Sequence, residues 1–190
     1  MSLEDKSELS SLINAWRYRD LGQWDKLADA FHPDGRVEIT WFEGRFQDFI
    51  EGSKQMGKSS TRTKHIIATP HIQFRGSRAV VETNATIVAQ HLDLHLGCDQ
   101  HCRFFDWVEK RDGCWKLVKK QCIYDMGTFT FPRGPVEVDA TVLERYPYEY
   151  GPLAYLLEKT GYTLRRVFAT RGSDLERTMK EEGARWLAGP

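Results

Sequence analysis

Residues 102–129, CRFFDWVEKRDGCWKLVKKQCIYDMGTF, contain two runs rich in aromatic and β-branched residues around the turn RDGC at 111–114. Such runs are typical of β-strands, and an Asp-Gly pair between them predicts a tight antiparallel hairpin. Upstream, HIIATPHIQF (65–74) and AVVETNATIVAQHLDL (79–94) have the same character and are separated by RGSR. The sequence therefore predicts a meandering antiparallel sheet from about residue 65 to residue 130.

The segment before this sheet has helical periodicity, which predicts an amphipathic helix over about 3–20, a second one directly after Gly22, and a third capped by Asp48. Helices followed by strands indicate an α+β fold. After Phe131, several prolines lead to two further helices, one over about 152–160 and one that begins at Ser173. We interpret 1–130 as one domain and 131–190 as a C-terminal extension, too short for a core of its own.

The composition limits the classes of function. Lys+Arg and Asp+Glu both count 27, so no net charge favours nucleic acid or an anionic membrane surface. The N-terminus MSLEDKSELSSLINAW lacks the basic and apolar regions of a signal peptide, and no apolar run approaches about 20 residues. We expect a cytoplasmic protein that binds neither nucleic acid nor membrane. No glycine-rich phosphate loop follows a strand, so we expect no nucleotide or flavin cofactor.

The run HLDLHLGCDQHC at 91–102 raises the question of a metal site. On an extended strand, His91 and His95 would lie about 13 Å apart, too far to share one ion. Cys98 and Cys102 have no second cysteine pair to complete a zinc site. The spacing favours a solvated hairpin tip, and we expect no bound metal.

Two polar residues stand at positions where apolar ones are expected. Asp20 continues the apolar stripe of the first helix, four residues after Trp16, so its carboxylate needs a partner. A structural ion pair with Arg17 or Arg19 is one reading. His65 opens the first long β run, and an Asp–His acid–base pair is the other reading.

Three stretches carry a resemblance to a known family: DLGQWDKLADAFHPDGRVEI, RTKHIIATPHIQFRGSRAVVETNATI and FFDWVEKRDGCWKLVKKQC. Over about residues 5–130 the chain resembles the polyketide-cyclase-like (SnoaL-like) branch of the nuclear-transport-factor-two-like superfamily, in particular scytalone dehydratase and hexachlorocyclohexane dehydrochlorinase. The resemblance implies a cone-shaped, strongly curved antiparallel sheet (a cystatin-like fold) that wraps around the N-terminal helices and encloses a pocket.

The resemblance also implies roles for individual residues. Asp20 and His65 match the catalytic pair in which the histidine removes a proton from carbon and the aspartate holds the imidazole. Lys120 falls where the dehydrochlorinase has a pocket arginine. The chain departs from these enzymes at Ala15, Ile39 and Asp106, where they carry a lysine, a tyrosine and a histidine, so their substrates are not implied.

Strand alternation completes the predicted pocket. If Lys120 points inward, Tyr124 shares its face, as an oxyanion donor or as a core ring. Lys120 itself could equally be a solvated strand lysine. The register of the hairpin is open at this stage, and the resemblance favours Phe104 and Asp106 inward. The full set predicted to line the substrate pocket is Asn84, Thr86, Val88, Phe104, Asp106, Val118 and Cys122.

Two functions follow. The first is a cofactor-free lyase or isomerase, dehydratase-like, acting on a small organic substrate. The alternative is a non-catalytic small-molecule-binding or assembly module of the same fold. The same alternation turns five large apolar residues outward, which predicts a homodimer or homotrimer through that face, or coverage by the last helix. These residues are Phe105, Trp107, Trp115, Leu117 and Ile123.

Overall fold

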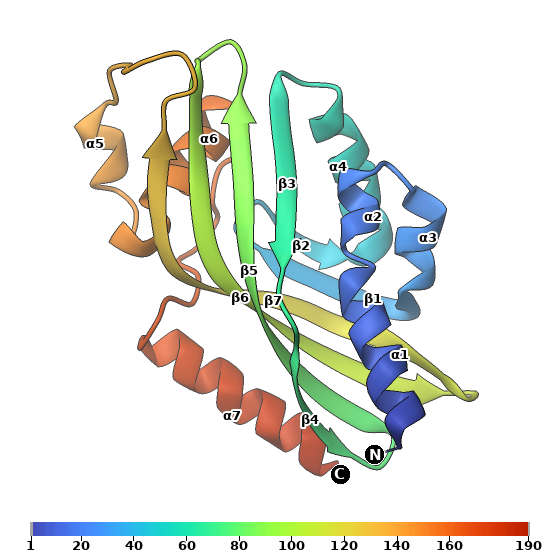
Figure 1. The fold of residues 1–190 in the computed structure, drawn as a ribbon. Helices are drawn as coiled ribbons and strands as arrows, with labels where there is room; N and C mark the ends of the chain where they lie inside the picture. Colours follow the sequence, from blue (N-terminus) through green and yellow to red (C-terminus); the bar gives the residue numbers. More distant parts are fainter. Residues whose placement is uncertain (1, 190) are drawn as a thin grey trace.

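The structure, a computed structural model, describes residues 2–189 and is built on one strongly curled sheet (Figure 1). Within these residues seven strands form the sheet in the order β2-β1-β7-β6-β5-β3, and β4 also pairs with β5. All strand pairs are antiparallel except β1 with β7, which is parallel, so the sheet is mixed. The strands are β1 Phe31–Ile39, β2 Phe42–Arg45, β3 Thr61–Ile67, β4 His71–Arg75, β5 Arg78–His91, β6 Leu96–Arg111 and β7 Cys114–Thr130.

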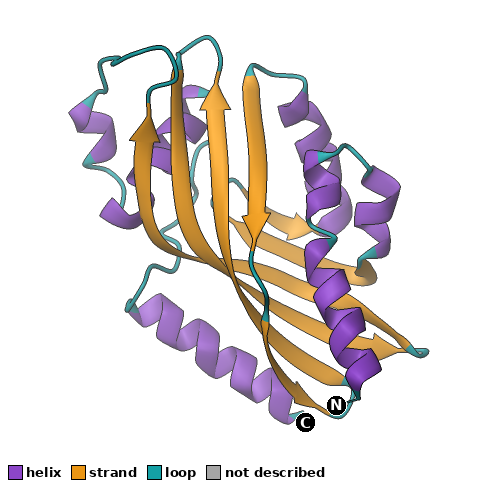
Figure 2. Cartoon of the chain, viewed as in Figure 1, coloured by secondary structure: helices purple, strands orange, loops and turns teal. Residues whose placement is uncertain are grey.

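Helices lie on both sides of this sheet, as the colouring of Figure 2 shows. The predicted α+β class with a curved sheet is confirmed. The predicted first helix is split in two near Trp16, and the third begins at Phe46, before Asp48. The helices are α1 Leu3–Asn14, α2 Arg17–Asp20, α3 Trp24–Asp29, α4 Phe46–Gly57, α5 Ala140–Leu143, the 3-10 helix η1 Tyr148–Tyr150, α6 Gly151–Lys159 and α7 Asp174–Ala188. None of the helices in 2–189 combines the length and the apolar character that crossing a membrane requires.

The long hairpin β6–β7 sets the curvature. Asp112 and Gly113 form its two-residue turn with φ angles of 51° and 80°, the positive values that a tight hairpin requires. Along β7, Val118 and Asp125 have no partner on β6, because the register shifts there. Such bulges bend a strand and increase its twist. The hairpin is therefore curved enough to have a concave and a convex face.

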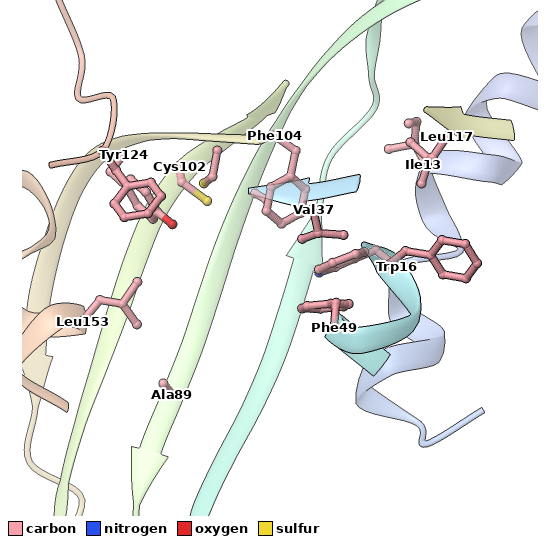
Figure 3. Packing of buried hydrophobic residues seen from close by; sticks show 14 of the residues in the cluster. Ile13, Trp16, Val37, Phe49, Ala89, Cys102, Phe104, Leu117, Tyr124 and Leu153 are labelled. Carbon is pink, nitrogen blue, oxygen red and sulfur yellow. The ribbon is translucent and has the colours of Figure 1, made fainter. Parts of the chain in front are cut away.

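The concave face carries the main hydrophobic core (Figure 3). There Trp16 stacks on Phe49 with ring centroids 5.1 Å apart, and its edge meets Phe104 at 5.9 Å. From the other end of the sheet, α6 adds Leu153 and Leu156 to the same core. The extension after residue 130 thus packs inside the cone as well as outside it.

The convex face is covered by α7, which lies across the outside of the sheet in Figure 1. Trp107 stacks on Trp186 with centroids 5.3 Å apart. Arg103 ties the helix to the sheet, since its guanidinium donates to Glu176 of α7 at 2.6 Å and to Asp125 at 2.8 Å. The apolar cluster beneath the helix comprises Val80, Phe105, Ile123, Ala169, Trp107, Met179, Trp186 and Leu187.

Two residues predicted on this convex face lie on the other side. Trp115 and Leu117 are buried in the concave core, because the bulge at Val118 inverts the alternation along β7. The three residues that do face outward, Phe105, Trp107 and Ile123, are covered by α7 of the same chain. They leave no bare apolar face there that a second copy must cover.

Gly183 offers a test of this packing. A Cβ at Gly183 would come within 2.7 Å of the Phe105 ring. Alanine is a better helix former than glycine by about 1 kcal/mol, whereas overpacking costs about 1–3 kcal/mol. We therefore expect Gly183→Ala to lower the free energy of unfolding by about 1 kcal/mol in urea titrations. Gly57→Ala in α4, where the new methyl meets nothing within 4 Å, is the control and should be neutral or stabilising. A higher free energy of unfolding for Gly183→Ala than for the wild type would contradict the packing of α7 on Phe105. Adding Phe105→Leu to Gly183→Ala should relieve the clash, because it removes the ring that the new methyl group meets.

Candidate active site

Asp20 and His65 form a hydrogen-bonded pair between the end of α2 and the middle of β3. Asp20 Oδ1 accepts a hydrogen bond from His65 Nδ1 at 2.7 Å, and Oδ2 accepts one from the backbone N–H of His65 at 2.6 Å. Because a carboxylate can only accept, Nδ1 carries the proton and Nε2 keeps its lone pair. The predicted pair is thus assembled, and its carboxylate fixes the tautomer of the ring.

The His65 ring lines a cavity inside the curved sheet. Its Nε2 has no hydrogen-bond partner among residues 2–189, so it can accept a proton from a bound molecule. The cavity volume is about 60 Å³, enough for a few water molecules or a small ligand. The walls are largely apolar and include Trp16, Ile39, Ile87, Ala89, Phe104 and Leu156.

The surroundings hold the pair in the ionisation states that a base requires. Burial lowers the pKa of His65, the charges of Arg19 and Lys120 lower it further, and the hydrogen bond to Asp20 opposes them without outweighing them. Burial alone would raise the pKa of Asp20, but the hydrogen bonds from His65 and the charge of Arg19 bring it below its ordinary value. At neutral pH the pair is therefore a carboxylate behind a neutral imidazole.

Arg19 is a site residue that the sequence suggested only as an ion-pair partner of Asp20. Its side chain is 7% exposed and lies against the same cavity as His65. Nη1 donates to Thr63 Oγ1 at 2.8 Å and lies 3.6 Å from Asp20 Oδ1, beyond hydrogen-bond range. Asp20 thus takes part in both predicted interactions: its carboxylate forms an ion pair with Arg19 and a hydrogen bond with His65.

Lys120 and Asp106 form a second buried pair, opposite each other on β7 and β6. Lys120 Nζ lies 3.1 Å from both carboxylate oxygens of Asp106, and the two side chains are 1% and 0% exposed. Burial raises the pKa of Asp106, while Lys120 opposes the rise. The ammonium also lies 3.9 Å from the centroid of the Phe104 ring. Both residues point inward as predicted, but they lie beneath Phe104 and do not line the cavity.

Tyr124 does line the cavity, but its hydroxyl is already bonded. It accepts a hydrogen bond from the backbone N–H of Thr40 at 3.1 Å and donates to Thr40 Oγ1 at 3.2 Å. Burial raises the pKa of Tyr124 well above its ordinary range, so the phenol stays protonated. In this arrangement Tyr124 ties the end of β1 to β7.

The strand register corrects part of the predicted pocket. Phe104 and Cys122 line the cavity as predicted. Asn84, Thr86 and Val88 were assigned to the wrong face, because Thr83 pairs with Phe104 and shares its inward direction, which places the even-numbered residues of β5 outside. Val118 is the bulge residue and is likewise absent from the lining.

The contribution of α6 to the cavity wall was not predicted from the sequence. The cavity wall also includes Leu153, Leu156, Leu157 and Thr160, and Figure 3 shows Leu153 well apart from Trp16. The signal that could have found them is the apolar run PLAYLL, in which both helix faces are hydrophobic, as in a helix buried on more than one side.

The run at 91–102 forms a hairpin tip. His91 pairs with Leu96, and residues 92–95 between them are exposed. Cys98 and Cys102 are buried on the concave face, whereas His101 is exposed. In the part of the chain that the structure describes, no three His, Cys, Asp or Glu side chains gather in an arrangement that could hold a metal ion.

Comparisons with known proteins agree with this geometry. Residues 1–121 match the SnoaL-like domain family. An uncharacterised protein of Aspergillus terreus is 31% identical over 179 residues, which cover 82% of this chain and 66% of that protein, so the chain spans slightly less than two thirds of its length.

Two solved structures share the fold. A provisionally assigned scytalone dehydratase of Novosphingobium aromaticivorans has a TM-score of 0.59 at 20% identity, covering 71% of this chain and 97% of that one. A hexachlorocyclohexane dehydrochlorinase has a TM-score of 0.58 at 15% identity, covering 72% and 94%. At these identities the likeness concerns the fold alone.

The lowered pKa of His65 predicts how stability depends on pH. Below the ordinary value of 6.5, the unfolded chain binds a proton at His65 that the folded protein does not bind. The free energy of unfolding should therefore fall as the pH decreases from 7.5 to 5.5 in urea titrations, and less so in His65→Gln. His71→Gln, on an exposed strand position, is the matched control and should keep the wild-type slope. If the free energy of unfolding changed equally with pH in the wild type and in His65→Gln, the lowered pKa of His65 would be contradicted.

Proposed function

We propose that this chain, which belongs to the SnoaL-like domain family, is a cofactor-free lyase or isomerase that removes a proton from carbon. One observation carries the proposal: His65 lines an apolar cavity and its Nε2 is free, while Asp20 holds Nδ1 of the ring with Oδ1 and the backbone N–H of His65 with Oδ2. A structural histidine is ordinarily satisfied at both nitrogens when it is buried. An unpartnered acceptor that faces a cavity is what a general base requires.

The chemistry follows from this arrangement. The Nε2 lone pair takes the proton as the C–H bond of the substrate breaks. The electron pair moves to a neighbouring carbonyl oxygen, or it forms a double bond as a leaving group departs from the adjacent carbon. The imidazolium that results is stabilised by the Asp20 carboxylate 2.7 Å from Nδ1. Positioned proton transfer of this kind contributes roughly 10²–10⁴-fold.

The other residues named from the sequence take supporting roles in this proposal. The ammonium of Lys120 is paired with Asp106, so we assign it no contact with the substrate. Its charge lowers the pKa of His65 and so helps to keep the imidazole neutral before the reaction. Tyr124 could donate to a developing oxyanion only by turning its hydroxyl hydrogen away from Thr40 Oγ1. We therefore place Asp20 and His65 at the centre of the reaction and assign Tyr124 and Lys120 to the surroundings.

The kind of substrate is suggested by the cavity and by the relatives. A small, apolar enclosure selects a small and largely apolar molecule. The names of the two structural neighbours, a dehydratase and a dehydrochlorinase, both denote eliminations in which a proton leaves one carbon. Elimination of water or another small leaving group is accordingly our preferred reaction.

A second candidate is a small-molecule-binding module without catalysis. The observation that favours it is the closure by α6, which leaves the cavity a volume of about 60 Å³. Under this alternative, the Asp20–His65 bonds serve to join α2 to β3. We regard residues 131–190 as part of the 1–130 domain in either case, because Leu153 and Leu156 share its core. A homodimer or homotrimer stays a prediction, which light scattering on the full chain would measure.

The proposal predicts how the pair responds to substitution. We expect wild-type protein in ²H₂O to catalyse deuterium incorporation next to the carbonyl of at least one member of a panel of small ketones, β-hydroxy ketones and keto acids, followed by NMR. His65→Gln and Asp20→Asn should each lower the rate by about 10²–10⁴-fold. Because Asp20 acts through His65, the double variant should be little slower than either single one.

Two substitutions control for non-specific effects. His71→Gln and Asp25→Asn change exposed residues of the same types and should leave the exchange rate unchanged. Circular dichroism should show that all variants are folded. Strictly additive losses would argue against a catalytic unit. Ligand binding without exchange for any panel member would favour the binding module.

A further inference from the structure

The buried guanidinium of Arg19 lies next to the proposed base. Asp20 Oδ1 lies 3.6 Å from Arg19 Nη1 and 2.7 Å from His65 Nδ1, so one carboxylate joins the two side chains on the wall of the cavity. Three further neighbours of the guanidinium, Thr63, Met56 and Trp41, also line this cavity. Arg19 therefore borders the cavity that His65 lines, and it also borders a more open hollow on the side of Asp20.

The protein satisfies this guanidinium incompletely. Arginine has five N–H donors, yet within residues 2–189 Arg19 makes a hydrogen bond to only one oxygen, Thr63 Oγ1 at 2.8 Å. Its other partner is the sulfur of Met56 at 3.4 Å, a weak acceptor. Asp20 compensates part of the charge as an ion pair, but its Oδ1 lies 3.6 Å from Nη1, and its two shorter hydrogen bonds go to His65. Burial lowers the pKa of Arg19, but an arginine stays charged in proteins.

Other polar atoms around the cavity also lack partners. Trp16 lines the cavity, and its Nε1 is a buried donor without an acceptor among the described residues. Thr61 Oγ1, from the same lining, is likewise buried and unpaired. Buried polar groups are ordinarily hydrogen-bonded, so a site with spare donors is completed by a ligand that brings acceptors.

We infer that Arg19 determines specificity at this site by binding a carboxylate of the ligand, so that the substrate is a small, otherwise apolar organic acid. The planar fork of the guanidinium matches the two oxygens of a carboxylate. A neutral carbonyl could accept a hydrogen bond, but it would add no second negative charge beside the guanidinium, whose one anionic neighbour among residues 2–189, Asp20, also bonds to His65. This inference rests on the proposed function for the identity of the site, and it adds the chemical class of the substrate.

The geometry also places the rest of the molecule. A carboxylate held by Arg19 leaves its carbon skeleton in the apolar part of the cavity, beside His65 and Phe104, whose ring centroids lie 6.2 Å apart. The carbon that loses a proton then lies near Nε2. The volume of about 60 Å³ restricts the skeleton to a few carbons unless α6 moves outward.

The test compares acids with their neutral amides in the intact protein. Propanoate, butanoate, hexanoate and benzoate are titrated by calorimetry, each against its primary amide at the same pH and salt concentration. We expect at least one acid to bind at least about tenfold more tightly than its amide, as a charge-assisted hydrogen-bonded pair implies. Arg19→Gln should abolish this preference, and Arg19→Lys should weaken it, since lysine keeps the charge without the fork.

Matched variants separate this inference from the proposed function. Arg17→Gln removes an exposed arginine of the same short helix and should keep the wild-type preference for acids. His65→Gln should keep it as well, because binding does not need the base, so loss of exchange activity with retained acid binding leaves the inference standing. Equal affinity for acids and amides in the wild type would overturn it without any variant. An unchanged preference in a folded Arg19→Gln would overturn it too.

Discussion

Two residues of β7 that have no partner on β6 determine the shape of this protein. Val118 and Asp125 are bulged, and the long hairpin bends around them into a wall with an inside and an outside. The inside holds the core and the cavity, and the outside is available for α7. Each bulge also inverts the alternation of the strand, so the position of Lys120 beneath the cavity and that of Trp115 in the core depend on the same unpaired residue.

Buried charges are the second constraint. A charge removed from water is costly unless it is paired, and on the concave side Asp20 lies beside Arg19 and Asp106 beside Lys120. The second set is saturated, since both oxygens of Asp106 contact the lysine. The first set is not saturated, because Asp20 bonds to a neutral imidazole and Arg19 is left with spare donors. The two sets therefore differ in how completely their charged groups are satisfied within residues 2–189.

Much of this fold could be predicted from the sequence, because the turn residues and the periodicity of the apolar residues indicate the same arrangement of helices and strands. The Asp112-Gly113 pair fixed the turn, and the position of Asp20 on an apolar stripe indicated a buried carboxylate before any partner was known. The pocket lining was less predictable. The bulge at Val118 leaves no reliable mark in one sequence, and the face of Asn84 depends on the register between β5 and β6, where a shift of one residue exchanges inside and outside. The free donors of Arg19 are a property of three-dimensional packing, which periodicity does not encode.

The wall that α6 supplies has an evolutionary consequence. The match to the family ends at residue 121, whereas Leu153, Leu156 and Leu157 lie beyond it and face the same cavity as His65. The Asp20–His65 pair lies within the family match, whereas part of the wall of its cavity lies beyond it. Drift or replacement within α6 can alter which molecules fit while the hydrogen bonds of Asp20 stay intact. A lineage that shares the scaffold can in this way change the shape of the cavity while it retains the Asp20–His65 pair.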